Sequence, residues 1–116
     1  MATVADFRAI LAELPGAEEV EKWGSPHVVV GDKLLGGLNE ATGVVSLKAS
    51  KDDQTALVAS DPDTFGVAAY VGRYGWITVR LAGVGVDELR ELVVEAWRRT
   101  APKREVKAFD AAADGG

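Results

Sequence analysis

The sequence contains one histidine, His27, and no cysteine. A Ser-His-Asp triad or a general base could use only this side chain, and a multi-histidine or thiolate metal site is excluded. Imidazole can change its charge near neutral pH, which would make His27 a titrating functional group. The alternative, which we favour, is an ordinary half-exposed strand residue after the turn at Pro26. We therefore expect a protein that is not an enzyme and that needs no cofactor.

Three carboxylates close to one another, Glu18, Glu19 and Glu21, could indicate acid-base chemistry or a site for a hard cation such as Ca²⁺. Neighbouring side chains of a strand point to opposite faces, so these groups do not converge on one point. Their composition is also typical of a solvated strand edge. We favour that interpretation and expect no metal site here.

Two glycine-containing segments, 31–37 and 72–75, resemble phosphate-binding loops in composition only. Neither has the Walker spacing, and neither has the GxGxxG pattern between a strand and a helix. We interpret these glycines as turn residues.

The segment around Arg73 is more suggestive, because this cation is flanked by the aromatic residues Tyr70, Tyr74 and Trp76. A cation among flat rings could stack nucleic-acid bases and pair with phosphate. The alternative is that Tyr70 and Trp76 pack into the core while Arg73 is a solvated loop tip.

Two further cations flank predicted strands and would extend this surface if they faced the same way. The candidate nucleic-acid-binding residues are therefore Lys33, Lys48, Arg73, Tyr74 and Trp76. The net charge of −5 opposes nonspecific adsorption to nucleic acid or anionic lipid. Much of the acidity is N-terminal, since residues 1–30 hold five acidic and two basic side chains.

The length of 116 residues and the hydrophobic content of 47% predict one domain with one core. We expect the domain to occupy residues 1–104, followed by a partly flexible tail over 105–116 that offers little apolar surface. The N-terminal segment carries charges where a secretory signal would be apolar, and no segment has membrane-spanning length. These features predict a cytoplasmic protein without a membrane partner.

Helical periodicity predicts helices over about 4–14, 51–60 and 88–99, with Thr3, Ser50 and Asp87 as N-caps. Strand character is predicted over 17–23, 27–30, 33–38, 44–48, 67–71 and 76–81. The two-residue break at Gly31-Asp32 predicts a tight hairpin, and the last two strands should form another. Short connections favour antiparallel pairing, so we predict a two-layer α+β fold with helices packed on an antiparallel sheet.

Several motifs resemble the MmcQ/YjbR family over residues 3–104. They are Leu14-Pro15-Gly16, Trp23-Gly24-Ser25-Pro26-His27, Gly31-Asp32-Lys33, Leu47-Lys48, Asp61-Pro62, Tyr70–Trp76, Trp97 and Ala101-Pro102-Lys103. The resemblance implies a compact α+β fold similar to CyaY-like and secretion-chaperone-like proteins. It also implies the family's description as predicted DNA-binding, with Lys33, Lys48, Arg73 and Trp76 on motif positions, and it implies no reaction.

The sequence departs from the family pattern at Val28–Val30 and Leu34-Leu35, which are aliphatic where an aromatic and a basic residue are expected. This difference weakens the base-stacking surface that the resemblance implies. Two hypotheses follow: a DNA-binding protein, and a chaperone-like module that binds a protein or a small ligand. We favour the first because the Arg73 cluster and the family description agree. The sequence does not determine the oligomeric state.

Overall fold

A computed structural model describes residues 1–115 of the chain, and Gly116 lies outside the described residues. The sheet strands are β1 (Ala17–Lys22), β2 (Ser25–Val30), β3 (Lys33–Asn39), β4 (Val44–Leu47), β5 (Phe65–Val67) and β6 (Ile77–Arg80). The α-helices are α1 (Val4–Ala12), α2 (Lys51–Ser60), α3 (Val86–Arg98) and α4 (Lys103–Gly115), and short 3-10 helices span Gly72–Tyr74 and Leu81–Gly83.

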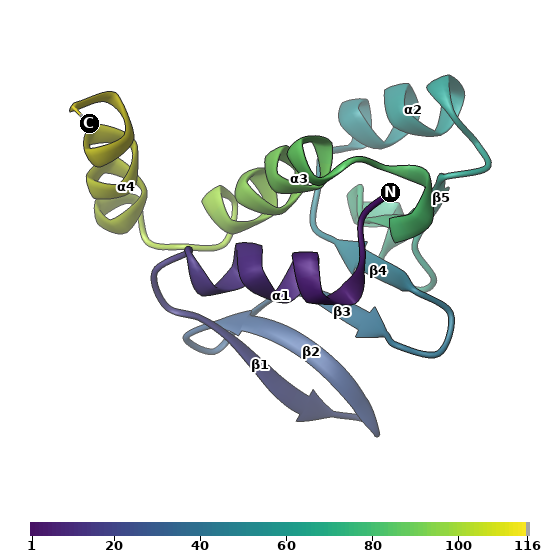
Figure 1. The fold of residues 1–116 in the computed structure, drawn as a ribbon, viewed down its shortest axis with the longest axis horizontal. Helices are drawn as coiled ribbons and strands as arrows, with labels where there is room; N and C mark the ends of the chain where they lie inside the picture. Colours follow the sequence, from purple (N-terminus) through teal and green to yellow (C-terminus); the bar gives the residue numbers. More distant parts are fainter. Residues whose placement is uncertain (116) are drawn as a thin grey trace.

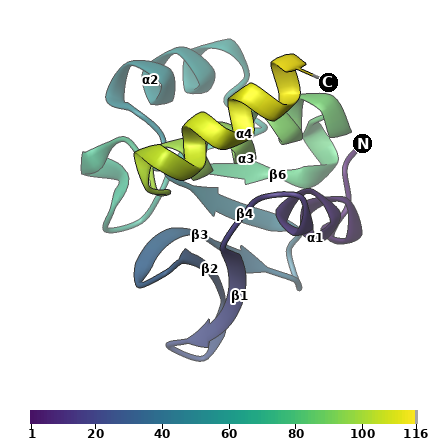
Figure 2. The same ribbon diagram turned by 90° about the vertical axis from the view of Figure 1, so that its left-hand side faces the viewer.

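The six strands form one antiparallel sheet in the order β1-β2-β3-β4-β6-β5. Helices α1 and α3 lie together over one face of this sheet, and α2 lies beside β5 (Figures 1 and 2). The predicted α+β class with an antiparallel sheet is confirmed. None of the helices within residues 1–115 is long and apolar enough to cross a bilayer.

The core lies between the sheet and the α1–α3 layer. Trp97 of α3 is its largest fully buried side chain, and the indole Nε1 donates to the carbonyl oxygen of Pro15 at 2.8 Å. This bond ties α3 to the turn that follows α1. Aliphatic side chains of the four central strands complete the core: Val28, Val30, Leu35, Val45, Leu47, Ile77 and Val79.

The helix starts agree with the sequence prediction at two of three positions. Thr3 forms a capping box with Asp6, and the Ser50 hydroxyl accepts from the backbone N–H of Asp53 at 3.1 Å. Asp87 is not the cap of α3, because the helix begins at Val86, two residues before the predicted start, and Gly85 is the N-cap without a side-chain bond. The carboxylate of Asp87 lies in the first turn, where it still interacts favourably with the helix dipole.

Two strand predictions change in the structure. The segment predicted as a strand over 67–71 leaves the sheet after Val67, and residues 68–76 instead form turns and the 3-10 helix. The predicted hairpin is confirmed, since β5 and β6 pair with Phe65 opposite Val79. The first strand ends at Lys22, because Trp23-Gly24 forms the turn to β2.

The C-terminal segment forms α4, a helix that the sequence analysis did not predict. Phe109 lies against Trp97 with 5.0 Å between ring centroids, and the Arg98 guanidinium donates to Asp110 at 2.6 Å. These two contacts hold α4 at the end of α3, away from the sheet (Figure 1). Apolar contacts of Val106 and Phe109 with the core therefore support a helix whose composition is otherwise poor in core-forming side chains. The flexibility of residues 105–116 stays a prediction.

Candidate binding groove on the open face of the sheet

The sheet face opposite the core carries small and polar side chains. The strand register places His27, Gly37, Ser46, Thr78 and Gly66 in one row across five strands. Side chains alternate between the two faces along each strand, and each of these residues has at least one sequence neighbour in the core. We call this row, on the side away from α1 and α3, the open face.

A groove of about 550 Å³ lies on the open face. It is lined by three residues of the row, two residues of β3, the β1–β2 turn and the loop before β6. The lining residues are Trp23, His27, Leu34, Gly36, Ser46, Ala68, Ala69, Tyr70, Val71, Trp76 and Thr78. A smaller hollow of about 210 Å³ continues from it past His27, Ser46 and Thr78. The groove thus combines three polar floor residues with apolar walls and an aromatic rim, a composition typical of small-molecule and base-binding sites.

Two aromatic side chains on the rim are exposed to solvent. Trp23 is 80% exposed and Tyr70 is 97% exposed. Both have left-handed backbone conformations, with φ of 52° and 63°, and they are the non-glycine residues with positive φ within residues 1–115. For a bulky residue this conformation costs on the order of 1 kcal/mol or more, and such strain concentrates at functional sites. Neither burial of the ring nor the preference of the backbone conformation explains why aromatic residues occupy these two positions.

The position of Trp23 is set by the turn between β1 and β2. Lys22 pairs with Ser25, so Trp23 and Gly24 form a two-residue hairpin loop with positive φ at both positions. This geometry favours asparagine or glycine in the place of Trp23. The indole ring lies edge-on to the His27 imidazole at 5.1 Å, and the ammonium of Lys22 lies 5.5 Å from the indole centroid.

The loop that carries Tyr70 is anchored to α2 by a buried glutamine. The amide nitrogen of Gln54 donates to the carbonyl oxygens of Gly72 at 2.7 Å and Trp76 at 2.8 Å. Gly75 has φ of 97°, and a Cβ atom there would lie 2.6 Å from the backbone of Ser50. Only glycine allows this close approach to the start of α2. The 3-10 helix and the C-terminal end of the loop are thereby fixed, and Tyr70 lies just before this fixed part.

The floor presents hydrogen-bonding atoms that the protein itself leaves unused. His27 Nδ1 lies 3.0 Å from the carbonyl oxygen of Ser25. A carbonyl oxygen can only accept, so Nδ1 donates and Nε2 of the neutral ring is left as an acceptor. The hydroxyls of Ser46 and Thr78 have no hydrogen-bond partner within residues 1–115, unlike those of Ser60 and Thr100.

The predicted aromatic and cationic loop lies beside this groove. Trp76 is 8% exposed and lines the groove wall, so it is close to the core position that the alternative prediction gave it. Tyr70 is not in the core. The Arg73 guanidinium lies over the ring of Tyr74 at 4.9 Å, and Tyr74 is 61% exposed. Arg73 and Tyr74 therefore form a cation–π pair adjoining the rim.

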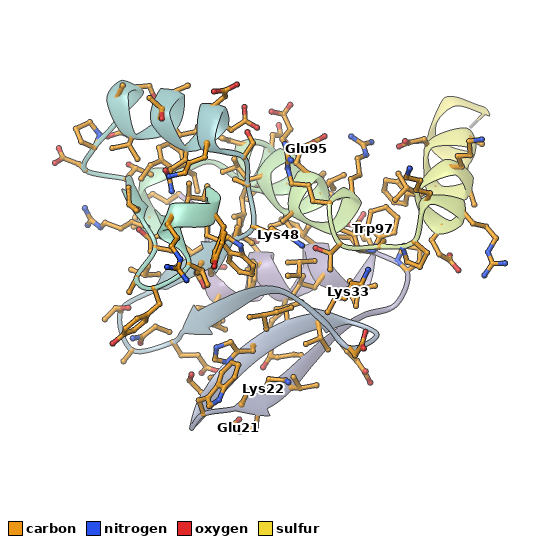
Figure 3. The ribbon with its side chains drawn as sticks, turned by 180° about the vertical axis from the view of Figure 1, so that it is seen from behind. Glu21, Lys22, Lys33, Lys48, Glu95 and Trp97 are labelled. Atoms are coloured by element: carbon orange, nitrogen blue, oxygen red, sulfur yellow. The ribbon has the colours of Figure 1, made fainter. Side chains whose placement is uncertain are left out.

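The two predicted lysines lie elsewhere. Lys33 begins β3 opposite Val30, whose side chain belongs to the core. Lys48 follows β4 and lines a separate cavity of about 280 Å³ between α2 and α3, together with Asp53 and Arg99. Figure 3 shows Lys22 near the tip of the β1–β2 hairpin, whereas Lys33 and Lys48 lie nearer to α3. The structure does not bring these lysines to the groove.

The glutamates of β1 also lie outside the groove floor. Glu18 and Glu21 are exposed, and Glu19 accepts hydrogen bonds from Arg8 at 2.9 and 3.0 Å. Arg8 also pairs with Glu40. The hydrogen bond from Arg8 lowers the pKa of Glu19 below its usual range, and the two carboxylates raise the pKa of Arg8. This cluster joins α1 to the sheet edge and has a structural role.

Comparison with known proteins agrees with the resemblance noted from the motifs. The YjbR family model matches residues 12–99, which is most of the chain. The chain belongs to the YjbR family. The match includes the Trp23 turn, the row of the open face and the loop of Tyr70, so every lining residue of the groove lies within the family domain.

The proteins similar to this chain support its fold, and their names indicate no activity. Uncharacterised proteins of Mycobacterium bovis and Mycobacterium tuberculosis are 36% identical over 67 residues, which cover 57% of this YjbR chain and 52% of each relative. The chain thus spans about half the length of these curated relatives. A crystal structure of Deinococcus radiodurans protein DR2400, with the family domain DUF419, superposes with a TM-score of 0.75. It is 23% identical, and the match covers 84% of this chain and 77% of that protein.

Proposed function

We propose that this YjbR-family chain is a non-enzymatic binding protein that holds single-stranded DNA by stacking bases on Trp23 and Tyr70 across the open-face groove. One observation carries the proposal: two exposed aromatic side chains, both in strained left-handed conformations, lie on the rim of the same groove. Neither side chain is buried and both backbone conformations are costly, so a ligand that stacks on flat rings gives the simplest account of both.

Stacking supplies most of the expected affinity. A base on an aromatic side chain contributes about 1–3 kcal/mol, and every base has a face that can stack. Duplex DNA keeps its bases stacked on each other and is therefore a poor ligand for such a rim.

Electrostatics contributes less than in strongly basic DNA-binding proteins. The net charge is −5, and the cations beside the rim are Lys22 and Arg73, each already over an aromatic ring. Neutralising two phosphates of a single strand gives a slope of log affinity against log salt of roughly −1.4. We therefore expect binding that weakens modestly with salt.

The test is fluorescence anisotropy with a labelled thymidine oligonucleotide at low and moderate salt. Trp23→Ala and Tyr70→Ala should each weaken binding about tenfold or more, whereas Trp23→Phe and Tyr70→Phe, which keep a stacking ring, should bind nearly as the parent does. Arg73→Ala should reduce the salt slope, and Lys48→Ala should have no effect because Lys48 lies between α2 and α3.

Two results would contradict this proposal. Equal loss of binding in Lys48→Ala and Trp23→Ala would move the site away from the groove. Absence of binding at low salt, with the protein folded, would remove DNA as the ligand.

A second candidate is a single small planar ligand held in the groove alone. The volume of about 550 Å³ and the unpaired Ser46 and Thr78 hydroxyls favour it, because one small molecule could occupy both rim and floor. The length of the oligonucleotide distinguishes the two. Affinity that rises from a mononucleotide to a hexanucleotide supports DNA, and equal affinity for both supports the small ligand.

A further inference from the structure

The floor of the groove contains the atoms needed to recognise a base by its edge as well as by its face. Resting on the proposed function, we propose that His27 and Ser46 read the hydrogen-bonding edge of one unpaired base. In this arrangement Nε2 of His27 accepts from a base N–H, and the Ser46 hydroxyl donates to the acceptor atom next to it. Stacking on the rim would hold the base, and this pair would orient it.

The orientation of His27 is fixed before a ligand arrives. Nδ1 donates to the Ser25 carbonyl oxygen at 3.0 Å, and the indole of Trp23 packs edge-on against the ring at 5.1 Å. The first contact selects the tautomer in which Nε2 accepts, and the second restricts rotation of the ring. A preoriented acceptor loses little entropy when a ligand binds.

Space for the base edge comes from Gly37, which lies between His27 and Ser46 in the row. A Cβ atom at residue 37 would lie 3.2 Å from Ser46 Oγ, 3.3 Å from His27 Cδ2 and 3.5 Å from His27 Nε2. Ser46 Oγ and His27 Nε2 therefore lie within 3.5 Å of one point next to the Gly37 Cα, and no side chain at residue 37 covers them. A donor and its neighbouring acceptor on one ligand edge could reach them together.

The unpaired state of these atoms favours a polar ligand edge over an apolar one. Within the described chain the Ser46 hydroxyl has no partner, and Nε2 has none either. Covering them with an apolar surface would leave each atom without a hydrogen bond and would weaken binding. A ligand that occupies the groove must therefore supply both a donor and an acceptor.

Unpaired nucleobases meet this requirement because each presents an N–H beside an acceptor on its Watson–Crick edge. In a duplex that edge is already engaged. Thymine gives the clearest test, since N3–H is the only donor of its ring once the base is attached to the sugar. Methylation of N3 removes this donor and leaves the face of the ring available for stacking.

The experiment compares three hexanucleotides by anisotropy: thymidine, deoxyuridine, and N3-methylthymidine. Deoxyuridine keeps the same edge without the C5-methyl group and is the composition control. The parent protein should bind the first two alike and the N3-methylated strand about tenfold more weakly. His27→Phe, which keeps a ring against Trp23, should weaken thymidine binding and bind both thymine strands alike, because the acceptor for N3–H is gone. Ser46→Ala should also weaken thymidine binding, but it should still bind the N3-methylated strand more weakly, because His27 Nε2 is retained.

Gly37→Ala adds a variant of the opposite kind, because it fills the space and leaves both polar groups in place. It should weaken the thymidine strand severalfold without altering the far-ultraviolet circular dichroism. Ser60→Ala, a serine change at the end of α2 away from the groove, should match the parent for all strands.

The outcomes separate this inference from the function on which it rests. Equal parent affinity for the thymidine and N3-methylthymidine strands, with loss of both in Trp23→Ala, would overturn edge recognition and leave the stacking function in place. No parent binding to any strand would overturn both.

Discussion

The two faces of the sheet differ in how their side chains are used. The helix-covered face is filled by large apolar residues, and the nitrogen of its one buried indole, Trp97, has a hydrogen-bond partner. The open face has glycines, two hydroxyls without partners, one imidazole and two exposed aromatics in a left-handed backbone. We therefore expect stability to depend on the first face and the proposed recognition on the second. Substitutions should affect one property without the other.

Trp97→Ala should give the largest effect, and it should act on stability alone. Removing a fully buried indole and its bond to Pro15 should lower the free energy of unfolding by about 3–5 kcal/mol. Urea denaturation followed by circular dichroism measures this. Under conditions where the variant is still folded, its affinity for the oligonucleotide should be that of the parent. Weaker binding by the folded variant would show that the two faces are coupled.

Gln54→Leu should affect both properties, because Gln54 links α2 to the loop of the open face. The substitution removes two hydrogen bonds to carbonyl groups that each keep one backbone partner, so the cost should be about 1–2 kcal/mol. Release of the loop should also weaken DNA binding severalfold.

A double-mutant cycle with Tyr70→Ala tests this route. In the Tyr70→Ala background the Gln54 substitution should have a much smaller effect on binding, since the loop no longer carries its stacking ring. Additive effects of the two changes would show that Gln54 does not act through Tyr70.

Trp23→Gly should separate recognition from stability in the opposite direction to Trp97→Ala. Glycine accepts positive φ without strain, so the free energy of unfolding should stay within about 1 kcal/mol of the parent value or rise. DNA binding should fall about tenfold or more. Thermal unfolding and anisotropy on the same preparation measure both. A large loss of stability would show that Trp23 is a structural residue.

Arg8→Ala should have the smallest effect, since this ion pair is exposed and belongs to neither face. The pKa of Glu19 is lower in the folded protein than in the unfolded chain. The ion pair with Arg8 therefore stabilises the folded protein at pH values above the pKa of Glu19 in the unfolded chain. This stabilisation is lost as pH falls through the pKa of Glu19 in the folded protein. The difference in melting temperature between parent and variant should be small at neutral pH. It should shrink in acid and in high salt.

Several features of the fold were predictable from local sequence. The capping box at Thr3, the turn at Gly31-Asp32 and the β character of the segments between turn residues depend on near neighbours in the chain, which the sequence displays directly. The order of these elements then favoured an antiparallel sheet. Helix α4 was missed because its support comes from Trp97, a partner in another helix.

The candidate site was only partly predictable. The sequence pointed to the loop around Arg73, and Trp76 and Tyr74 lie on or beside the groove. It gave no reason to place Trp23 and His27 beside Ser46 and Thr78, because these residues come from three different strands and the β1–β2 turn. The signal that was available was Trp23-Gly24 itself, a two-residue break where a bulky aromatic occupies a position suited to asparagine or glycine.

The sequence alone determined the composition of the core, most element boundaries, the family and the absence of cysteine chemistry, because these depend on residue types and short spacings. The tertiary structure decided which face of the sheet the helices cover, that Lys33 and Lys48 lie away from the groove, and that His27, Gly37 and Ser46 share one row. Strand register decides the last of these. It is set by pairing between residues far apart in the chain, which local sequence does not specify.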